Sequence, residues 1–298
     1  KSVQLTNVDS VHSGLACYNN GLQGCTAATV ARYRAKYLYN VLIGGDVRKM
    51  KRFDGKVVLV TGAGSGIGKA SALRLAAEGG ALLCADLDAG ALDATVSEIV
   101  SAGGEASGHA CDIADEAAVK ACVAACLDHY GRLDALVNMA GILRFDDTGE
   151  LATSAWQRVI DINLTGTMLL CREVLPHLVA SRGSIVNAAS TAALAGLPCG
   201  VAYSASKGGV LAMTRSIAVE YAKRGVRANC ICPGDIKTGM TRGVAFPDPK
   251  DWDLMPRISS LSGPLGPEVV AGVVAMLASE DGIHINGEDI RVDGATLA

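Results

Sequence analysis

The chain has 298 residues, of which 50% are hydrophobic and 19% are charged, a balance typical of a globular protein rather than a disordered one. Its formal net charge of −3 gives no indication of binding to nucleic acid or to an anionic membrane. No apolar run reaches the ~18 residues that suggest a membrane-spanning helix, so no such helix is expected.

Residues 1–49 differ from the rest of the chain. Residues 29–43 place apolar side chains at roughly helical spacing, and the remainder is rich in turn-forming residues. The features of a secretory signal do not occur together here. Because Met50 resembles a natural start, we expect residues 1–49 to be an expression-derived or upstream segment, with an oligomerisation or targeting arm as the alternative. Residues 50–298 then form the functional domain.

From Lys56 onward, short apolar runs alternate with helical stretches such as residues 66–78 and 89–101. This alternation predicts parallel strands joined by right-handed crossovers, and strands without polar alternation predict a sheet covered on both faces. We therefore predict a single α/β domain with a doubly wound, Rossmann-type parallel sheet, whose ligand lies at the carboxyl ends of the strands. The expected strands are residues 57–60, 81–85, 106–111, 133–138, 184–189 and 227–232.

A glycine-rich turn, residues 61–68, follows the first expected strand and opens a helix. Backbone N–H groups at a helix N-terminus favour an anion, and glycine lets the backbone approach a pyrophosphate closely. The spacing departs from G-x-G-x-x-G, since isoleucine stands at the third glycine position, but the strand–turn–helix context is the one required. The expected dinucleotide contacts are Gly62, Ser65, Gly66, Ile67 and Gly68.

Asp86 closes the second expected strand. A carboxylate at this point accepts hydrogen bonds from ribose hydroxyls and repels a 2′-phosphate, which favours NAD over NADP as the cofactor. The alternative is that Asp86 caps the following helix, but Asp88 is better placed to do so.

The ten cysteines are expected to be reduced thiols of a cytoplasmic protein. Cys122 and Cys126 share a predicted helix face, but nothing nearby completes a zinc-binding pattern. We therefore predict no metal site. Four other cysteines lie in apolar strand-like runs, where a thiol packs as a small hydrophobe: Cys84, Cys111, Cys230 and Cys232.

Together with the glycine turn, several further motifs resemble those of the classical short-chain dehydrogenases/reductases, in the same order and over residues 54–298. They are Asp112-Ile113, Asn138-Met139-Ala140-Gly141, Asn163, Ser190, Tyr203-x-x-x-Lys207 and the Pro233–Thr238 loop. Met139 departs from the family, which has a second asparagine there. The resemblance implies cofactor contacts by Asp112, Ile113, Asn138, Ala140, Gly141, Tyr203, Lys207, Pro233, Gly234, Ile236 and Thr238.

Tyr203 and Lys207 lie one helical turn apart, hence on one face. A tyrosine acts as acid/base for an alcohol only if its pKa falls from about 10 toward neutrality, and a nearby ammonium lowers it. The resemblance implies that Ser190 holds the substrate oxygen and that Asn163 holds Lys207 through a water. Each residue alone has a structural explanation, as a snorkelling lysine, a turn cap or a buried amide, but together they predict catalysis.

We thus expect an NAD-dependent oxidoreductase that interconverts a secondary alcohol and a ketone. The alternatives are an NADP-dependent 3-oxoacyl-carrier reductase and a catalytically silent, nucleotide-sensing regulator. Residues 239–264 are expected to form an apolar lid that either contacts a hydrophobic substrate or packs against the domain. The resemblance also implies a homotetramer, paired through residues 151–181 and 203–223, with residues 287–298 in a second interface.

Overall fold

The structure is a computed structural model that describes residues 51–241, 254, 258–261 and 263–298. The chain divides into two compact units, Lys1–Met50 and Lys51–Ala298, and the description below concerns the second. The segment 1–49, with its expected helix 29–43, lies outside the described residues. So does most of the expected lid 239–264.

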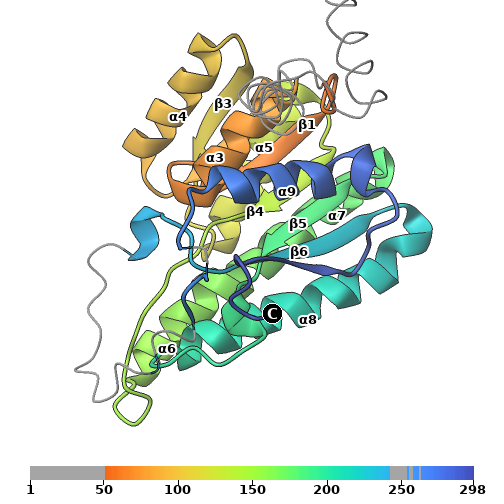
Figure 1. Cartoon of the computed structure of the whole chain (residues 1–298). Helices are drawn as coiled ribbons and strands as arrows, with labels where there is room; N and C mark the ends of the chain where they lie inside the picture. Colours follow the sequence, from red (N-terminus) through yellow and green to blue (C-terminus); the bar gives the residue numbers. More distant parts are fainter. Residues whose placement is uncertain (1–50, 242–253, 255–257, 262) are drawn as a thin grey trace, which may run out of the picture. The chain divides into compact units, whose positions relative to one another are not determined.

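Seven parallel strands form one sheet in the described domain, in the order β3-β2-β1-β4-β5-β6-β7 (Figure 1). The chain builds outward from β1 in one direction and then from β4 in the other, which confirms the predicted doubly wound sheet. The strands are β1 (Val57–Thr61), β2 (Ala81–Asp86), β3 (Glu105–Ala110), β4 (Ala135–Asn138), β5 (Ser184–Ala188), β6 (Arg227–Pro233) and β7 (Asp289–Val292).

Helices cover both faces of this sheet. Helices α3, α4 and α9 pack on one face, and α5, α7 and α8 pack on the other. In β1, Val57 and Leu59 belong to one core cluster while Val58 and Val60 belong to the other, because successive side chains of a strand alternate between faces. The helices are α3 (Gly66–Ala77), α4 (Ala89–Ser101), α5 (Glu116–Tyr130), α6 (Thr153–Ile160), α7 (Thr167–Ser181), α8 (Val201–Tyr221) and α9 (Glu268–Ala278), with a π-helix, Asp161–Gly166, between α6 and α7.

Strand β3 departs from the prediction that the strands are covered on both faces. It spans Glu105–Ala110, one residue earlier than expected, and each of its side chains is exposed or partly exposed. β3 has a neighbour on only one side, so it lies at the edge of the sheet, where less of the core reaches it. Its composition therefore reflects an edge position rather than a buried one.

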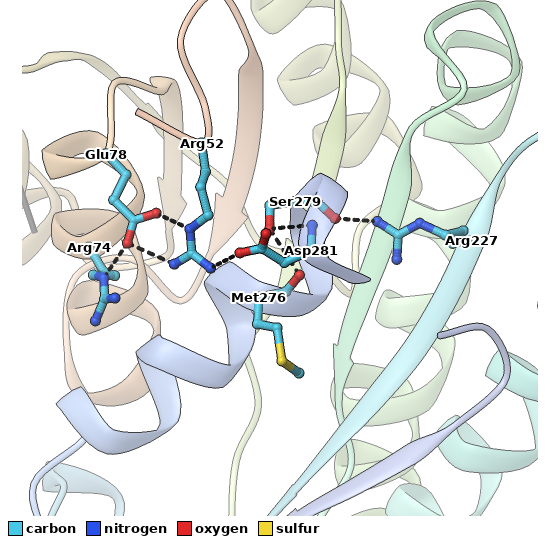
Figure 2. Close-up of polar contacts among 7 residues, drawn as sticks. All are labelled: Arg52, Arg74, Glu78, Arg227, Met276, Ser279 and Asp281. Atoms are coloured by element: carbon cyan, nitrogen blue, oxygen red, sulfur yellow. Dashed lines mark hydrogen bonds and ion pairs between the residues drawn. The ribbon is translucent and has the colours of Figure 1, made fainter. Parts of the chain in front are cut away.

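Basic side chains gather at the amino ends of the strands (Figure 2). Glu78, which ends α3, is fully buried and accepts hydrogen bonds from Arg52 at 2.5 and 2.8 Å and from Arg74 at 2.5 Å. Arg52 also bonds to Asp281, at 2.8 Å. A fully buried carboxylate is tolerated only when paired in this way, so the cluster ties the segment before β1 to α3 and to the end of α9.

Arg227, at the start of β6, belongs to the same end of the sheet. Its guanidinium donates to the carbonyl oxygens of Leu277 and Ser279, both at 2.9 Å, at the C-terminal end of α9. Cations are stabilising at helix C-termini, and in a parallel α/β fold these lie at the amino ends of the strands. A hollow of about 610 Å³ opens here, but it is lined by none of the predicted site residues.

Candidate active site

The residues predicted to bind the cofactor and substrate lie at the opposite end of the sheet. Because the strands are parallel, the segments that leave their carboxyl ends meet along one edge. The glycine turn follows β1, Asp86 ends β2, Asp112 follows β3, residues 139–141 follow β4, Ser190 follows β5 and Pro233 ends β6.

Glycine is required at three positions of the turn after β1. Gly62 and Gly66 have φ values of +66° and +53°, which side chains with a Cβ rarely adopt. A Cβ on Gly68 would overlap the carbonyl oxygen of Gly62. Ser65, the N-cap of α3, makes no side-chain capping bond in the described structure, so the N–H groups of the first helical turn remain to bind an anion.

Asp86 connects the end of β2 to this turn. Its Oδ2 accepts a hydrogen bond from the Gly64 N–H at 2.8 Å, and its Oδ1 accepts from the Asp88 N–H at 3.0 Å. Asp88 caps α4 by accepting from the Ala91 N–H at 3.0 Å, so Asp86 is not the helix cap. A carboxylate has about four acceptor positions, and Asp86 therefore keeps capacity for ribose hydroxyls.

The segment between β3 and α5 lies at the carboxyl end of β3, next to Asp86 at the end of β2. The strand was expected to run to Cys111 with Asp112-Ile113 directly after it, but it ends at Ala110. Asp112 instead starts a turn, with its Oδ1 accepting from the Ala114 N–H at 2.9 Å. Ile113 is buried, and Gly166 of the π-helix packs close to its carbonyl oxygen. The turn after β3 therefore packs directly against the π-helix that contains Asn163.

Thr61, which the sequence reasoning did not single out, joins β1 to the residues after β4. Its Oγ1 accepts hydrogen bonds from the N–H groups of Met139 and Ala140, at 3.1 and 3.3 Å. A Cβ on Gly62 would lie 2.8 Å from the Ala140 nitrogen. The two turns therefore approach each other closely enough to exclude side chains between them.

Asn138 points into the interior of the sheet layer. Its Nδ2 donates to Asn187 Oδ1 at 2.8 Å, and Asn187 in turn donates to Thr214 at 2.9 Å. The Asn138 Oδ1 is buried without a hydrogen-bond partner among the described residues. Met139, where the family has asparagine, is buried in the core on the other face. Of the four motif residues 138–141, Asn138 and Met139 are buried, whereas Ala140 and Gly141 are partly exposed.

Tyr203 and Lys207 lie in the first turns of α8, with the Lys207 Nζ 5.7 Å from the centre of the tyrosine ring. Lys207 is only 4% exposed, and its Nζ donates to the Ala188 carbonyl at 2.8 Å. Burial lowers the pKa of Lys207 to about 8. A group with this pKa still carries its proton for most of the time at pH 7.

Lys207 was expected to lower the pKa of Tyr203, but in the described structure Lys207 is not among the groups that shift this pKa. Burial raises the pKa of Tyr203 above its ordinary value, and this outweighs the lowering by a hydrogen bond with Ser190. The lysine ammonium faces the Ala188 carbonyl rather than the tyrosine oxygen, which explains why desolvation dominates.

Ser190 combines the two roles considered from the sequence. It is the N-cap of the short 3₁₀ helix Thr191–Ala193, where its Oγ accepts from the Ala192 N–H at 3.1 Å. The same side chain lies close enough to the Tyr203 hydroxyl to lower its pKa. Capping fixes the rotamer of Ser190, and the hydroxyl is thereby held beside the tyrosine.

Asn163 lies in the π-helix and is completely buried. Its Oδ1 accepts from the Ile142 N–H at 2.8 Å, and its Nδ2 donates to the Ile142 carbonyl at 2.9 Å and to Ser206 Oγ at 3.1 Å. Gly141 lies between Asn163 and Lys207, since a Cβ there would be 3.1 Å from Asn163 Oδ1 and 3.5 Å from Lys207 Nζ. The structure therefore brings Asn163 and Lys207 together.

The loop after β6 extends toward the glycine turn. The position of a Cβ on Gly66 would be 3.4 Å from the Thr238 methyl group, so Thr238 lies at the N-terminus of α3. Gly234 packs against Asp293, and Ile236 pairs with Leu265 in an isolated bridge. These contacts place the expected Pro233–Thr238 loop over the same edge of the sheet.

Other features of the described domain are structural. Its eight cysteines are free thiols, and Cys122 and Cys126 lie on the buried face of α5, in the core. No group of three or more histidine, cysteine or acidic side chains able to hold a metal ion occurs in the part of the chain that is described. Within the same residues, no helix is long and apolar enough to cross a membrane.

The chain is similar to characterised proteins over this domain. It is 37% identical to a meso-2,3-butanediol dehydrogenase of Serratia marcescens, over 83% of this chain and 96% of the relative. It is 38% identical to a 3-oxoacyl-acyl-carrier-protein reductase of Thermotoga maritima, over 83% and 99%. The crystal structure of levodione reductase matches with a TM-score of 0.75 and 34% identity, over 81% and 97%. Residues 56–246 match the short chain dehydrogenase family model, and the protein belongs to this family of oxidoreductases.

Proposed function

We propose that the protein is an NAD-dependent oxidoreductase that interconverts a secondary alcohol and a ketone, with Tyr203 as the general acid/base. Asp86 is the observation that supports NAD. Its carboxylate lies at the end of β2, bonded to the glycine turn, where a 2′-phosphate would meet a negative charge. The nucleotide fits the residues present, because Ser65 leaves the first N–H groups of α3 without a side-chain cap in the described domain and Asp86 keeps acceptor positions for ribose hydroxyls.

The cofactor contacts follow from this geometry. The N–H groups at the start of α3 would hold the pyrophosphate, Asp86 the adenine-side ribose, and Lys207 the nicotinamide ribose. Bound NAD supplies the acceptor for the hydride that leaves the alcohol carbon. Thr238 and the loop that carries it would cover the nicotinamide end.

The chain's own groups handle the proton. Tyr203 takes the proton from the substrate hydroxyl as the hydride leaves, and returns it in the reductive direction. Ser190, which acts on the pKa of the neighbouring Tyr203, holds the substrate oxygen beside it. Burial raises the pKa of Tyr203, and the Lys207 ammonium is bonded to the Ala188 carbonyl, so forming tyrosinate would require positive charge beyond that of Lys207 in the loaded site.

An apolar, mid-sized substrate is supported by the side chains around this edge. Leu194, in the loop after Ser190, is 39% exposed, and Met240 is equally exposed. Where such side chains form one contiguous patch, they mark a binding surface. The direct test is to measure initial rates for a panel of secondary alcohols and ketones with NAD and with NADP. Turnover of apolar secondary alcohols with NAD is expected, and a preference for NADP would contradict the cofactor assignment.

The second candidate is an NADP-dependent 3-oxoacyl-carrier reductase. The relative from Thermotoga maritima is named as a 3-oxoacyl-acyl-carrier-protein reductase and is as similar to this chain as the butanediol dehydrogenase. A 3-oxoacyl thioester included in the substrate panel separates the two candidates, because only the reductase would reduce it efficiently with NADPH. A nucleotide-sensing regulator would bind nucleotide without turnover of any substrate.

We also propose a cytoplasmic homotetramer. Val219 and Val201 of α8 are exposed apolar side chains, with Val219 82% exposed, which supports pairing of this helix with another copy. Sedimentation equilibrium would measure the assembly. A monomer at micromolar concentration would contradict it.

A further inference from the structure

We infer that Ser206 is a positioning residue that holds Asn163 and the Tyr203–Lys207 turn in register. The inference rests on the proposed function, because it concerns how the acid/base residues of that reaction are aligned. The Ser206 hydroxyl has no role of its own in proton transfer. It joins the π-helix, which carries Asn163, to the turn of α8 that carries Tyr203 and Lys207.

The hydroxyl of Ser206 uses its donor and an acceptor position at once. Its Oγ donates to the Tyr203 carbonyl at 2.7 Å and accepts from Asn163 Nδ2 at 3.1 Å. The residue has no exposed surface. A buried hydroxyl bonded on both sides has one available orientation, so the Asn163 amide is held relative to the first turn of α8.

Close packing one turn further along α8 reinforces this contact. A Cβ on Gly209 would lie 2.7 Å from Leu164 Cδ2, and Leu164 directly follows Asn163 in the π-helix. The small residue lets the two helices approach closely at this point. The approach brings Ser206 within hydrogen-bonding distance of Asn163.

Ser206 is the partner of one particular N–H of the Asn163 side-chain amide. The amide oxygen and the other N–H are bonded to the Ile142 backbone, and Thr167 Oγ1 donates to the Asn163 backbone carbonyl at 2.8 Å. The second amide N–H is bonded to Ser206. Without that acceptor, a fully buried N–H would lose its partner and the amide would gain freedom to rotate.

An ordinary helical serine offers a comparison on the same helix. Ser216 Oγ donates to the Ala212 carbonyl at 3.2 Å, but Ser216 is exposed and connects no other segment. If Ser206 acted only as a helix side chain, replacing either serine by alanine would have the same small effect. The two variants Ser206→Ala and Ser216→Ala therefore form a matched pair.

The test is steady-state kinetics at a temperature where all variants are folded. Ser206→Ala should lower kcat about tenfold, the equivalent of one lost hydrogen bond, with the KM for NAD unchanged within about twofold. Ser216→Ala should change neither. In the Asn163→Ala background, the further loss from Ser206→Ala should be much smaller, because both changes remove the same contact.

Each result decides the inference. A Ser206→Ala variant with wild-type kcat would overturn it, as would an equal fold-loss in the Asn163→Ala background. A purely structural role predicts lower thermal stability with unchanged kcat, which would also overturn it. A wild-type chain without turnover of any alcohol or ketone would instead contradict the proposed function itself, and would be seen before any serine variant is compared.

Discussion

The Lys207 ammonium donates a hydrogen bond to the Ala188 carbonyl oxygen, at 2.8 Å and at the carboxyl end of β5. This contact attaches the acid/base turn of α8 to the strand that leads into Ser190. A nearly buried cation is costly to the fold, and its lowered pKa, about 8, records that cost. The catalytic arrangement is therefore maintained at the expense of stability.

Replacing Lys207 should accordingly stabilise the protein at neutral pH. We expect Lys207→Met to abolish measurable turnover and to raise the free energy of unfolding at pH 7 by roughly 1–3 kcal/mol, after allowing for the lost bond to Ala188. Because the folded-state pKa of Lys207 lies below its unfolded value, wild type should gain stability as pH rises from about 8 to 10.5. The advantage of the variant should shrink over that window.

Urea denaturation between pH 7 and 10.5 measures this difference. Lys120→Met is the control, since Lys120 is 55% exposed on α5 and is paired only with Glu116 among the contacts described. Its effect should be small and independent of pH in this range. A Lys207→Met variant that is less stable than wild type at pH 7 would contradict the burial argument.

Asp86 should determine the choice between the two nucleotides. Asp86→Ser removes the carboxylate and is expected to weaken NAD binding and to strengthen NADP binding, because the repulsion of a 2′-phosphate is lost. Asp88→Ala is the matched control. It removes the cap of α4 and should lower stability by about 1 kcal/mol without changing the nucleotide preference. Titration calorimetry with both nucleotides checks the prediction, and an unchanged NAD/NADP ratio in Asp86→Ser would refute it.

Glu78 should contribute to stability and not to catalysis. Glu78→Gln leaves Arg52 and Arg74 without their shared buried carboxylate and is expected to cost about 3–5 kcal/mol. Glu116→Gln removes an exposed carboxylate that also pairs with lysine and arginine, and it should cost far less, because solvent screens such a pair. Denaturant unfolding compares the two, and kcat of the folded Glu78→Gln variant should match wild type. Equal costs would show that burial of Glu78 has little energetic effect.

The ends of α7 and α5 offer a paired test of backbone strain. Arg182 follows α7 with φ +53°, whereas Gly131 follows α5 with φ +73° and has open space where a Cβ would be. Arg182→Gly should stabilise the protein by about 1 kcal/mol and Gly131→Ala should destabilise it by a similar amount. Thermal unfolding should show opposite shifts in Tm. Shifts in the same direction would mean that side-chain contacts outweigh the backbone term.

Much of the fold could be predicted because its signals are local. Continuous apolar runs and the glycine turn between Thr61 and Gly68 depend on neighbouring residues, and they led to the doubly wound sheet that the structure confirms. The exposure of β3 could not be predicted in the same way. Whether a strand has one neighbour or two depends on how the whole sheet is assembled.

The candidate site shows the same limit. The sequence motifs identify Tyr203 and Lys207, but burial raises the pKa of the first and lowers that of the second. The Lys207 ammonium is bonded to the Ala188 carbonyl, which comes from strand β5 rather than from its own helix. Asn138 matches a cofactor motif, yet its side chain is bonded to Asn187 inside the sheet layer. Ser206 could have been noticed because it is three residues after Tyr203, but its partner Asn163 is 43 residues away.

The π-helix at Asp161–Gly166 implies an unusual response to deletion. A π-helical turn holds one residue more than an α-helical turn, so removing one residue would restore regular hydrogen bonding along α6 and α7. The same deletion would rotate the side chains before it by about 100° relative to those after it, and the Asn163 amide could no longer meet both Ile142 and α8. A shortened chain is thus expected to have a more regular helix and lower turnover, the opposite of what repairing a mere defect of the helix would give.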